Sequence, residues 1–185
     1  MNTSSNVTAG KPNIGGAIWQ GDATATLPTD ALAALGSGFK CLGYISDDGL
    51  TASNSPNATP VKAWGGDTVL TILGDKSDQF SFKLIEVLNL DVLKTVFGEE
   101  NVTGDLENGI TVKANASDLD EHSYVIDMVM RDNVIKRICI PSAKVTSIGD
   151  VVYSDGEAVG YDVTIDCYPD GAGNTHYEYL QKKKS

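Results

Sequence analysis

Residues 159–167 read Val-Gly-Tyr-Asp-Val-Thr-Ile-Asp-Cys, and this stretch decides the fold class. Apolar side chains at every second position, from Val159 to Cys167, alternate with small or polar ones. Successive side chains of a strand point to opposite faces, so a period of two predicts a strand with one apolar and one polar face. The polar face carries Asp162, Thr164 and Asp166.

The residues before this strand predict two further hairpins. Residues 124–130 alternate in the same way and end at Asp132-Asn133, a favourable turn pair. Residues 134–140 form the returning strand, which we expect Pro141 to stop because proline cannot donate to a sheet ladder. Residues 151–157, Val-Val-Tyr-Ser-Asp-Gly-Glu, carry a second hairpin signal.

The N-terminal half also has mostly strand character. Residues 39–46 are the first candidate strand, and residues 47–60 have turn and loop composition. Gly65-Gly66 predicts a tight reversal into a strand at residues 68–73. Residues 80–84, Phe-Ser-Phe-Lys-Leu, alternate strictly and predict a half-buried strand.

One helix interrupts the strands at residues 90–97. Asn89 is placed to cap it, Gly98 is placed to end it, and Leu90, Leu93 and Phe97 share one face. A helix of two to three turns is not stable alone, so it must pack on a sheet.

These elements predict a mainly β protein, a β-sandwich or barrel with one flanking α-helix. At 185 residues the chain has the length of one domain with extensions. We assign residues 1–38 to an N-terminal arm and loop, residues 39–168 to the β domain and residues 169–185 to a solvated C-terminal extension. The arm is polar, and its first 14 or so residues should be mobile in a free subunit.

Composition limits the function. The formal charge of -11 argues against a surface that holds nucleic acid through phosphate contacts, although nucleic acid can still pass such a protein without sticking. No apolar run approaches membrane-spanning length, and the N-terminus lacks the pattern of a signal peptide, so we expect no membrane contact and synthesis in a cytoplasm.

Motifs for catalysis, cofactors and metals are lacking in the sequence. The chain carries neither a phosphate-binding loop nor a nucleophile elbow nor a zinc-protease helix motif. Its three cysteines are widely spaced, and we expect Cys139 and Cys167 to pack in the core. We therefore predict no catalytic, cofactor-binding or metal-binding residues; a glycosidase with two carboxylates far apart in the chain is a minor alternative.

The segment Val61-Lys62-Ala63-Trp64-Gly65-Gly66-Asp67-Thr68-Val69 carries a resemblance. Together with residues 80–86 and the helix end Val96-Phe97-Gly98, it resembles the tail tube (major tail) proteins of long-tailed phages, over roughly residues 15–168. The resemblance implies a structural virion protein, similar in fold to the type VI secretion tube protein. Such proteins form hexameric rings that stack around a tape-measure protein into a tube through which double-stranded DNA later passes. The expected partners are further copies of the chain, the tape-measure protein, and tail-tip and terminator proteins. The expected location is the virion tail, after assembly in the bacterial cytoplasm.

The resemblance also suggests roles for two segments. The arm and the loop at residues 47–60 would bridge subunits, with Asp47, Asp48, Gly49, Ser53 and Asn54 as candidate inter-subunit residues. Asp162, Thr164 and Asp166 are candidates to face the lumen, where negative charge would keep DNA from the wall. The rival interpretation places these aspartates on the outer surface, facing solvent.

Two other function classes remain open. A β-sandwich binding module would be expected to show an aromatic-lined patch, for which Trp19 and Trp64 are the available tryptophans. A head decoration or tail-completion protein would share the acidic, β-rich composition without stacking into rings.

Overall fold

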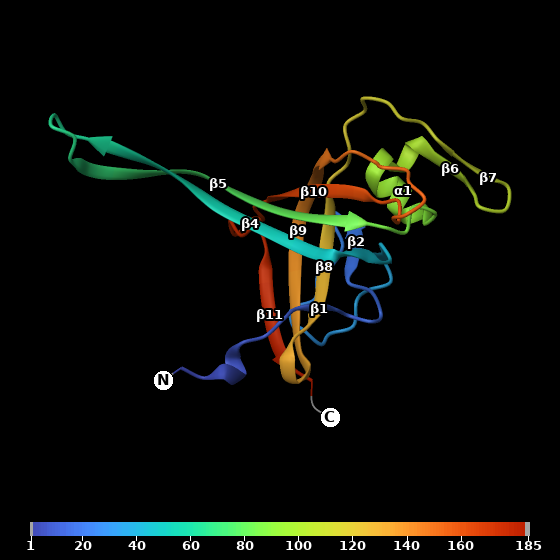
Figure 1. Cartoon of the computed structure of the whole chain (residues 1–185), viewed down its shortest axis with the longest axis horizontal. Helices are drawn as coiled ribbons and strands as arrows, with labels where there is room; N and C mark the ends of the chain where they lie inside the picture. The colour runs from blue at the N-terminus through green and yellow to red at the C-terminus, as the bar shows by residue number, and fades with distance from the viewer. Residues whose placement is uncertain (1, 184–185) are drawn as a thin grey trace.

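The computed structural model describes residues 2–183 and shows a mainly β protein with a single α-helix among them (Figure 1). Nine strands form one antiparallel sheet, in the order β3-β2-β8-β9-β10-β5-β4, with β1 added beside β8 and β11 beside β9. The strands are β1 (Lys11–Pro12), β2 (Ile18–Asp22), β3 (Lys40–Cys41), β4 (Ile45–Lys62), β5 (Thr68–Leu84), β8 (His122–Val129), β9 (Val134–Ile148), β10 (Tyr161–Tyr168) and β11 (Tyr177–Lys182). A separate hairpin pairs β6 (Val102–Asp105) with β7 (Gly109–Val112). The predicted fold class is confirmed.

The sheet folds over on itself at β9. The first part of β9 pairs with β8 and β11, and its last part pairs with β10. The β4, β5 and β10 layer therefore crosses the β8, β9 and β11 layer in Figure 1. The main core fills the inside of this fold. Its largest fully buried side chains include Tyr124, Phe80, Ile18, Leu42 and Leu84.

Helix α1 (Leu90–Phe97) has the predicted bounds. The Asn89 side chain accepts the Asp91 N–H, and Gly98, with φ 97°, ends the helix. Thr95 donates to Gln20 at 2.8 Å, and Gln20 donates to the Tyr124 hydroxyl at 3.2 Å. This buried chain of hydrogen bonds fixes the helix against β2 and β8, so the expected packing of the helix on the sheet is confirmed.

Strand β10 also follows the sequence prediction. Its alternate residues Tyr161, Val163, Ile165 and Cys167 are buried in the core. Cys139 is buried too, beneath the segment between β2 and β3. Burial raises the pKa of the Cys139 and Cys167 thiols to about 12, which keeps both neutral.

The expected arm at residues 1–38 is wrong for residues 17–22. Ile18 is fully buried, and β2 pairs with β8 over its whole length. The short apolar patch around Ile18 belongs to the core because β8, a central strand, pairs with it. The polar residues next to the patch in sequence gave no sign of this partner. The arm therefore ends at about Gly16.

Two other expectations need correction. Strand β9 runs through Pro141, because the register against β8 shifts there and the partner on the other side changes from β11 to β10. The missing N–H of Pro141 thus falls where one ladder ends and the next begins. The expected C-terminal extension contains strand β11, and Lys184 of its lysine run lies outside the described residues.

The second predicted hairpin, at residues 151–157, is confirmed as a chain reversal, but these residues do not form strands. β9 ends at Ile148 and β10 begins at Tyr161, so an irregular loop joins these paired strands. The Asp132-Asn133 turn is confirmed, with φ of 59° and 58° at the two residues.

Candidate assembly surfaces

The most prominent feature is a hairpin made of β4 and β5 that projects far from the body (Figure 1). The loop expected at residues 47–60 is wrong as secondary structure, because the whole segment lies in β4 and pairs with β5 from Leu50 onward. Its candidate residues Ser53 and Asn54 pair with Gln79 and Asp78. The polar composition suggested a loop because, after Leu50, neither face of this part of β4 is buried by the body.

Asp47, Asp48 and Gly49 lie in an irregular part of the same strand. The register between β4 and β5 shifts between Ile45 and Leu50. Ser46 Oγ donates to Asp48 at 3.0 Å, and Gly49 has a φ of 76°. This bulge lies at the base of the hairpin, where it bends the strand as the hairpin leaves the body.

The tip of the hairpin is the predicted reversal. The Ala63 N–H donates to Asp67 O at 2.8 Å, and the Gly66 N–H donates to Ala63 O at 3.0 Å. Gly65 and Gly66 have φ of 118° and 99°, which other residues rarely adopt. Trp64 is fully exposed at this tip. A fully exposed tryptophan at the end of a projecting hairpin is a candidate contact residue for a binding surface.

The base of the hairpin is anchored from the C-terminal side. Asp78 of β5 is 3% exposed, and its Oδ2 accepts from the Thr175 hydroxyl and lies 2.6 Å from His176 Nδ1. The His176 ring packs edge-on against Phe80, with ring centroids 5.4 Å apart. These contacts join β5 to the segment that precedes β11 at the point where β5 leaves the core.

The three candidate lumen residues share the polar face of β10, which points away from the core. Thr164 lies 2.9 Å from Ser81 Oγ, and Lys83 Nζ approaches Asp162 Oδ2 at 4.0 Å. Asp166 is half-buried, and its Oδ1 has no hydrogen-bond partner. The face is thus polar but mixed in charge, because Lys83 stands directly across from Asp162.

The arm follows the far end of β8. Strand β1 pairs Lys11 and Pro12 with Val129 and Met128, and the Arg131 N–H donates to Thr8 Oγ1 at 2.7 Å. Residues 2–10 are exposed throughout.

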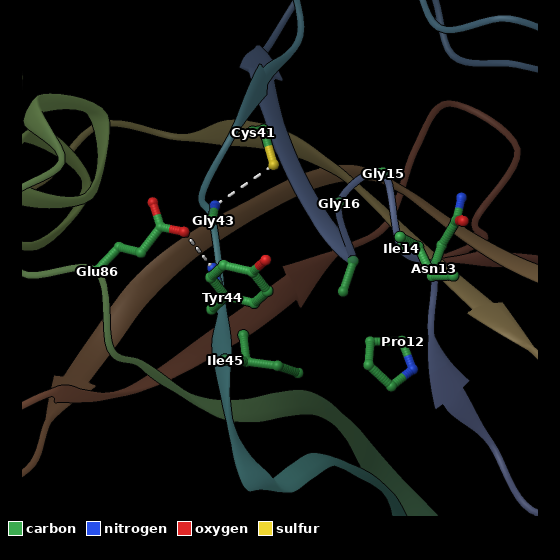
Figure 2. Close-up of a pocket in the computed structure, with 11 residues that line it drawn as sticks. Pro12, Asn13, Ile14, Gly15, Gly16, Cys41, Gly43, Tyr44, Ile45 and Glu86 are labelled. Atoms are coloured by element: carbon green, nitrogen blue, oxygen red, sulfur yellow. Dashed lines mark hydrogen bonds between the residues drawn. The ribbon is translucent and has the colours of Figure 1, made fainter. Parts of the chain in front are cut away.

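A pocket of about 380 Å³ opens between the arm and the start of β4 (Figure 2). It is lined by residues 12–17, Cys41, residues 43–45 and Glu86. The Tyr44 N–H donates to Glu86 Oε1 at 2.9 Å, and a Cβ on Gly43 would lie 2.1 Å from the Glu86 carboxyl carbon. Gly43 also has a φ of 74°, so both its backbone conformation and the close approach of Glu86 favour glycine at this position. The pocket offers a mostly apolar recess, large enough for a side chain of a partner.

The part of the chain that the structure describes shows no cluster of side chains suited to binding a metal ion. Residues 2–183 hold no group of three His, Cys, Asp or Glu side chains placed to bind a metal ion. The described helical segments include none long and apolar enough to span a membrane.

A family model described as Phage tail tube protein matches residues 1–185. The chain belongs to the phage tail tube protein family. Comparison with curated proteins gives no match. The tail tube protein is thus a structural component of the virion tail, of a kind that polymerises with itself into a tube.

Family membership confirms the resemblance drawn from the Trp64-Gly65-Gly66 segment. In this tail tube protein that segment is the tip of the projecting hairpin. The sequence interpretation predicted the reversal at this tip but missed the length of the hairpin behind it, although a signal was present. Residues 69–73 are nearly all apolar, without the alternation of a strand that buries one face.

Proposed function

We propose that the chain forms hexameric rings that stack into the tail tube, the conduit for phage DNA, and that the β4–β5 hairpin bridges neighbouring copies. The observation that carries this proposal is the exposure of the hairpin. Every described side chain from Thr51 to Ser77 is exposed in the monomer. An isolated two-stranded ribbon is marginally stable in water, so a hairpin of this length needs a partner.

The dimensions fit a bridge between subunits. At about 3.3 Å per residue, the ribbon from Thr51 to Lys62 spans roughly 40 Å. A projection of this length places the tip far from its own body, where it is within reach of a neighbouring copy (Figure 1). Contacts of this head-to-tail kind close into rings or continue into tubes, depending on the rotation between copies.

The sheet also supports ring formation. Strand β4 is an edge strand of the sheet and pairs with β5 on one side. The backbone groups along its other side have no neighbouring strand in the monomer. Open edges promote pairing with other chains, and closure of a ring removes them. In this arrangement the polar face of β10, with Asp162, Thr164 and Asp166, lines the lumen around the tape-measure protein and later the DNA.

The remaining parts of the proposal follow from a tube-forming role. The exposed arm at residues 2–9 contributes contacts between rings, and tail-tip and terminator proteins bind the two ends of the stack. Assembly takes place in the bacterial cytoplasm, the protein has no enzymatic activity, and DNA passes without tight binding.

Shortening the hairpin tests the proposal. Residues 56–76 are replaced by Asn-Gly, a two-residue turn that joins the paired residues Ser55 and Ser77. We expect the body to keep its cooperative thermal melt, because none of the described removed residues is buried. Elongation from sheared wild-type tubes, followed by sedimentation and electron microscopy, should be lost. Normal elongation by a folded, shortened chain would refute the bridging role.

A further inference from the structure

The outer part of the hairpin is apolar on both of its faces. We call residues 58–73 the outer ribbon. The pairs Val61–Leu70 and Thr59–Ile72 lie on one face, and the pairs Pro60–Thr71 and Ala58–Leu73 lie on the other, because directly paired residues share a face. The first face exposes Leu70 by 57% and Ile72 by 52%, and the second exposes Val69 by 63% and Leu73 by 74%.

The inner part of the hairpin shows that pairing alone does not require these side chains. Its pairs Thr51–Ser81, Ser53–Gln79 and Ser55–Ser77 are polar, yet they form the same ladder. The exposed apolar residues of the hairpin are therefore concentrated in the part farthest from the body. A ribbon that lay flat on one neighbour would bury one face and keep a polar face toward water.

Charge also favours another copy of this chain as the partner. Between Leu50 and Ser77 the charged residues are Lys62, Asp67, Asp75 and Lys76, so the hairpin has no formal net charge. The whole chain carries -11, and this charge therefore lies on the remainder. Two bodies of like charge repel each other, whereas a neutral apolar ribbon approaches such a body without this penalty.

We propose that the outer ribbon of each copy is inserted between two other copies of this chain, one covering each face. The inference rests on the proposed bridging function and adds the number and arrangement of the partners. Each hairpin then ties two neighbours to each other as well as to its own body. Such an insertion buries the exposed aliphatic side chains of the outer ribbon and gives each of its two faces a partner.

Two double variants separate the faces. Leu70→Thr with Ile72→Thr changes one face, and Val69→Thr with Leu73→Thr changes the other. Threonine keeps the preference for strand, so the ribbon still forms. Each variant should raise the critical concentration for elongation from wild-type seeds by about tenfold or more. The control, Ser53→Thr with Ser55→Thr in the inner ribbon, should leave it unchanged.

A second measurement does not depend on assembly strength. In a Cys41→Ser background, Leu70→Cys and Leu73→Cys each place one thiol on one face. A water-soluble maleimide should label both in the free subunit and neither in mixed tubes formed with excess wild-type chain.

The outcomes distinguish this inference from the proposed function. If one face alone is sensitive and protected, the ribbon docks on a single neighbour and the inference is overturned, while the bridging role stands. If neither face is sensitive or protected but the shortened hairpin fails to elongate, the inference is again wrong. Normal elongation by the shortened chain removes the bridging role and the inference together.

Discussion

Replacing Arg137 with methionine is expected to lower the free energy of unfolding by about 3–5 kcal/mol, the usual cost of breaking a buried ion pair. Arg137 on β9 is 6% exposed and Asp127 on β8 is 3% exposed. Two parallel hydrogen bonds join them, from Nε at 2.6 Å and from a terminal nitrogen at 2.8 Å. The other terminal nitrogen donates to the carbonyls of Ala33 at 2.6 Å and Asp30 at 3.3 Å. The pairing with Asp127 also raises the pKa of Arg137.

The magnitude follows from what the substitution leaves behind. Methionine fills much of the space but leaves the Asp127 carboxylate buried without its charged partner. It also removes the donor for two carbonyls of the segment between β2 and β3, which covers a smaller buried cluster of Phe39, Val125 and Cys139. For a chain of this size the loss corresponds to a fall in melting temperature of roughly 10 °C. Thermal and urea denaturation, followed by circular dichroism, measure both quantities.

The neighbouring residue provides a matched control. Lys136 Nζ lies 2.8 Å from Glu178 Oε1, in a pair whose glutamate is 40% exposed. Glu178→Gln should cost less than about 1 kcal/mol, because solvent screens an exposed pair. The double variant Arg137→Met with Asp127→Leu should recover part of the loss, since no charge then remains buried alone. A cost for Arg137→Met no larger than that for Glu178→Gln would refute the reasoning.

Three further predictions concern thiols, acid and charge. At pH 8 a thiol reagent should modify the half-buried Cys41 in the folded protein but not the other two cysteines until unfolding, because burial holds their pKa at about 12; rapid labelling of all three would contradict this. The hydrogen bond from Lys94 lowers the pKa of Glu99, so this pair stabilises the end of α1 above the ordinary carboxyl pKa, and the contribution is lost as pH falls through the lowered value. Glu99→Gln should reduce the loss of folding stability at acid pH by less than about 1 kcal/mol, since the glutamate is 52% exposed. An unchanged dependence of stability on pH in this range, in nuclear magnetic resonance or melting data, would contradict the prediction. If β10 lines the lumen, Asp162→Lys with Asp166→Lys should slow genome ejection from intact tubes, and ejection at the normal rate would remove these two residues from the lumen wall.

The sequence by itself determined the local elements. The helix at residues 90–97 was predictable because Asn89, Gly98 and the spacing of its apolar residues all act within the helix. Strand β10 was predictable because its alternation directly reflects one buried face. The reversal at Gly65-Gly66 was predictable because positive φ is a property of the residue itself. The same segment also carried the family resemblance.

The tertiary structure decided which segments pair at long range. Residues 47–60 form a strand because β5 lies beside them. After Leu50, which packs against the main core, neither face is buried by the body, so no hydrophobic period could mark these residues. Ile18 joins the core because β8 supplies its partners, and β9 continues through Pro141 because its neighbour changes there. The two-faced apolar ribbon behind Trp64 has the same physical cause. Periodicity records burial within one chain, and neither face of this ribbon is buried in the folded monomer.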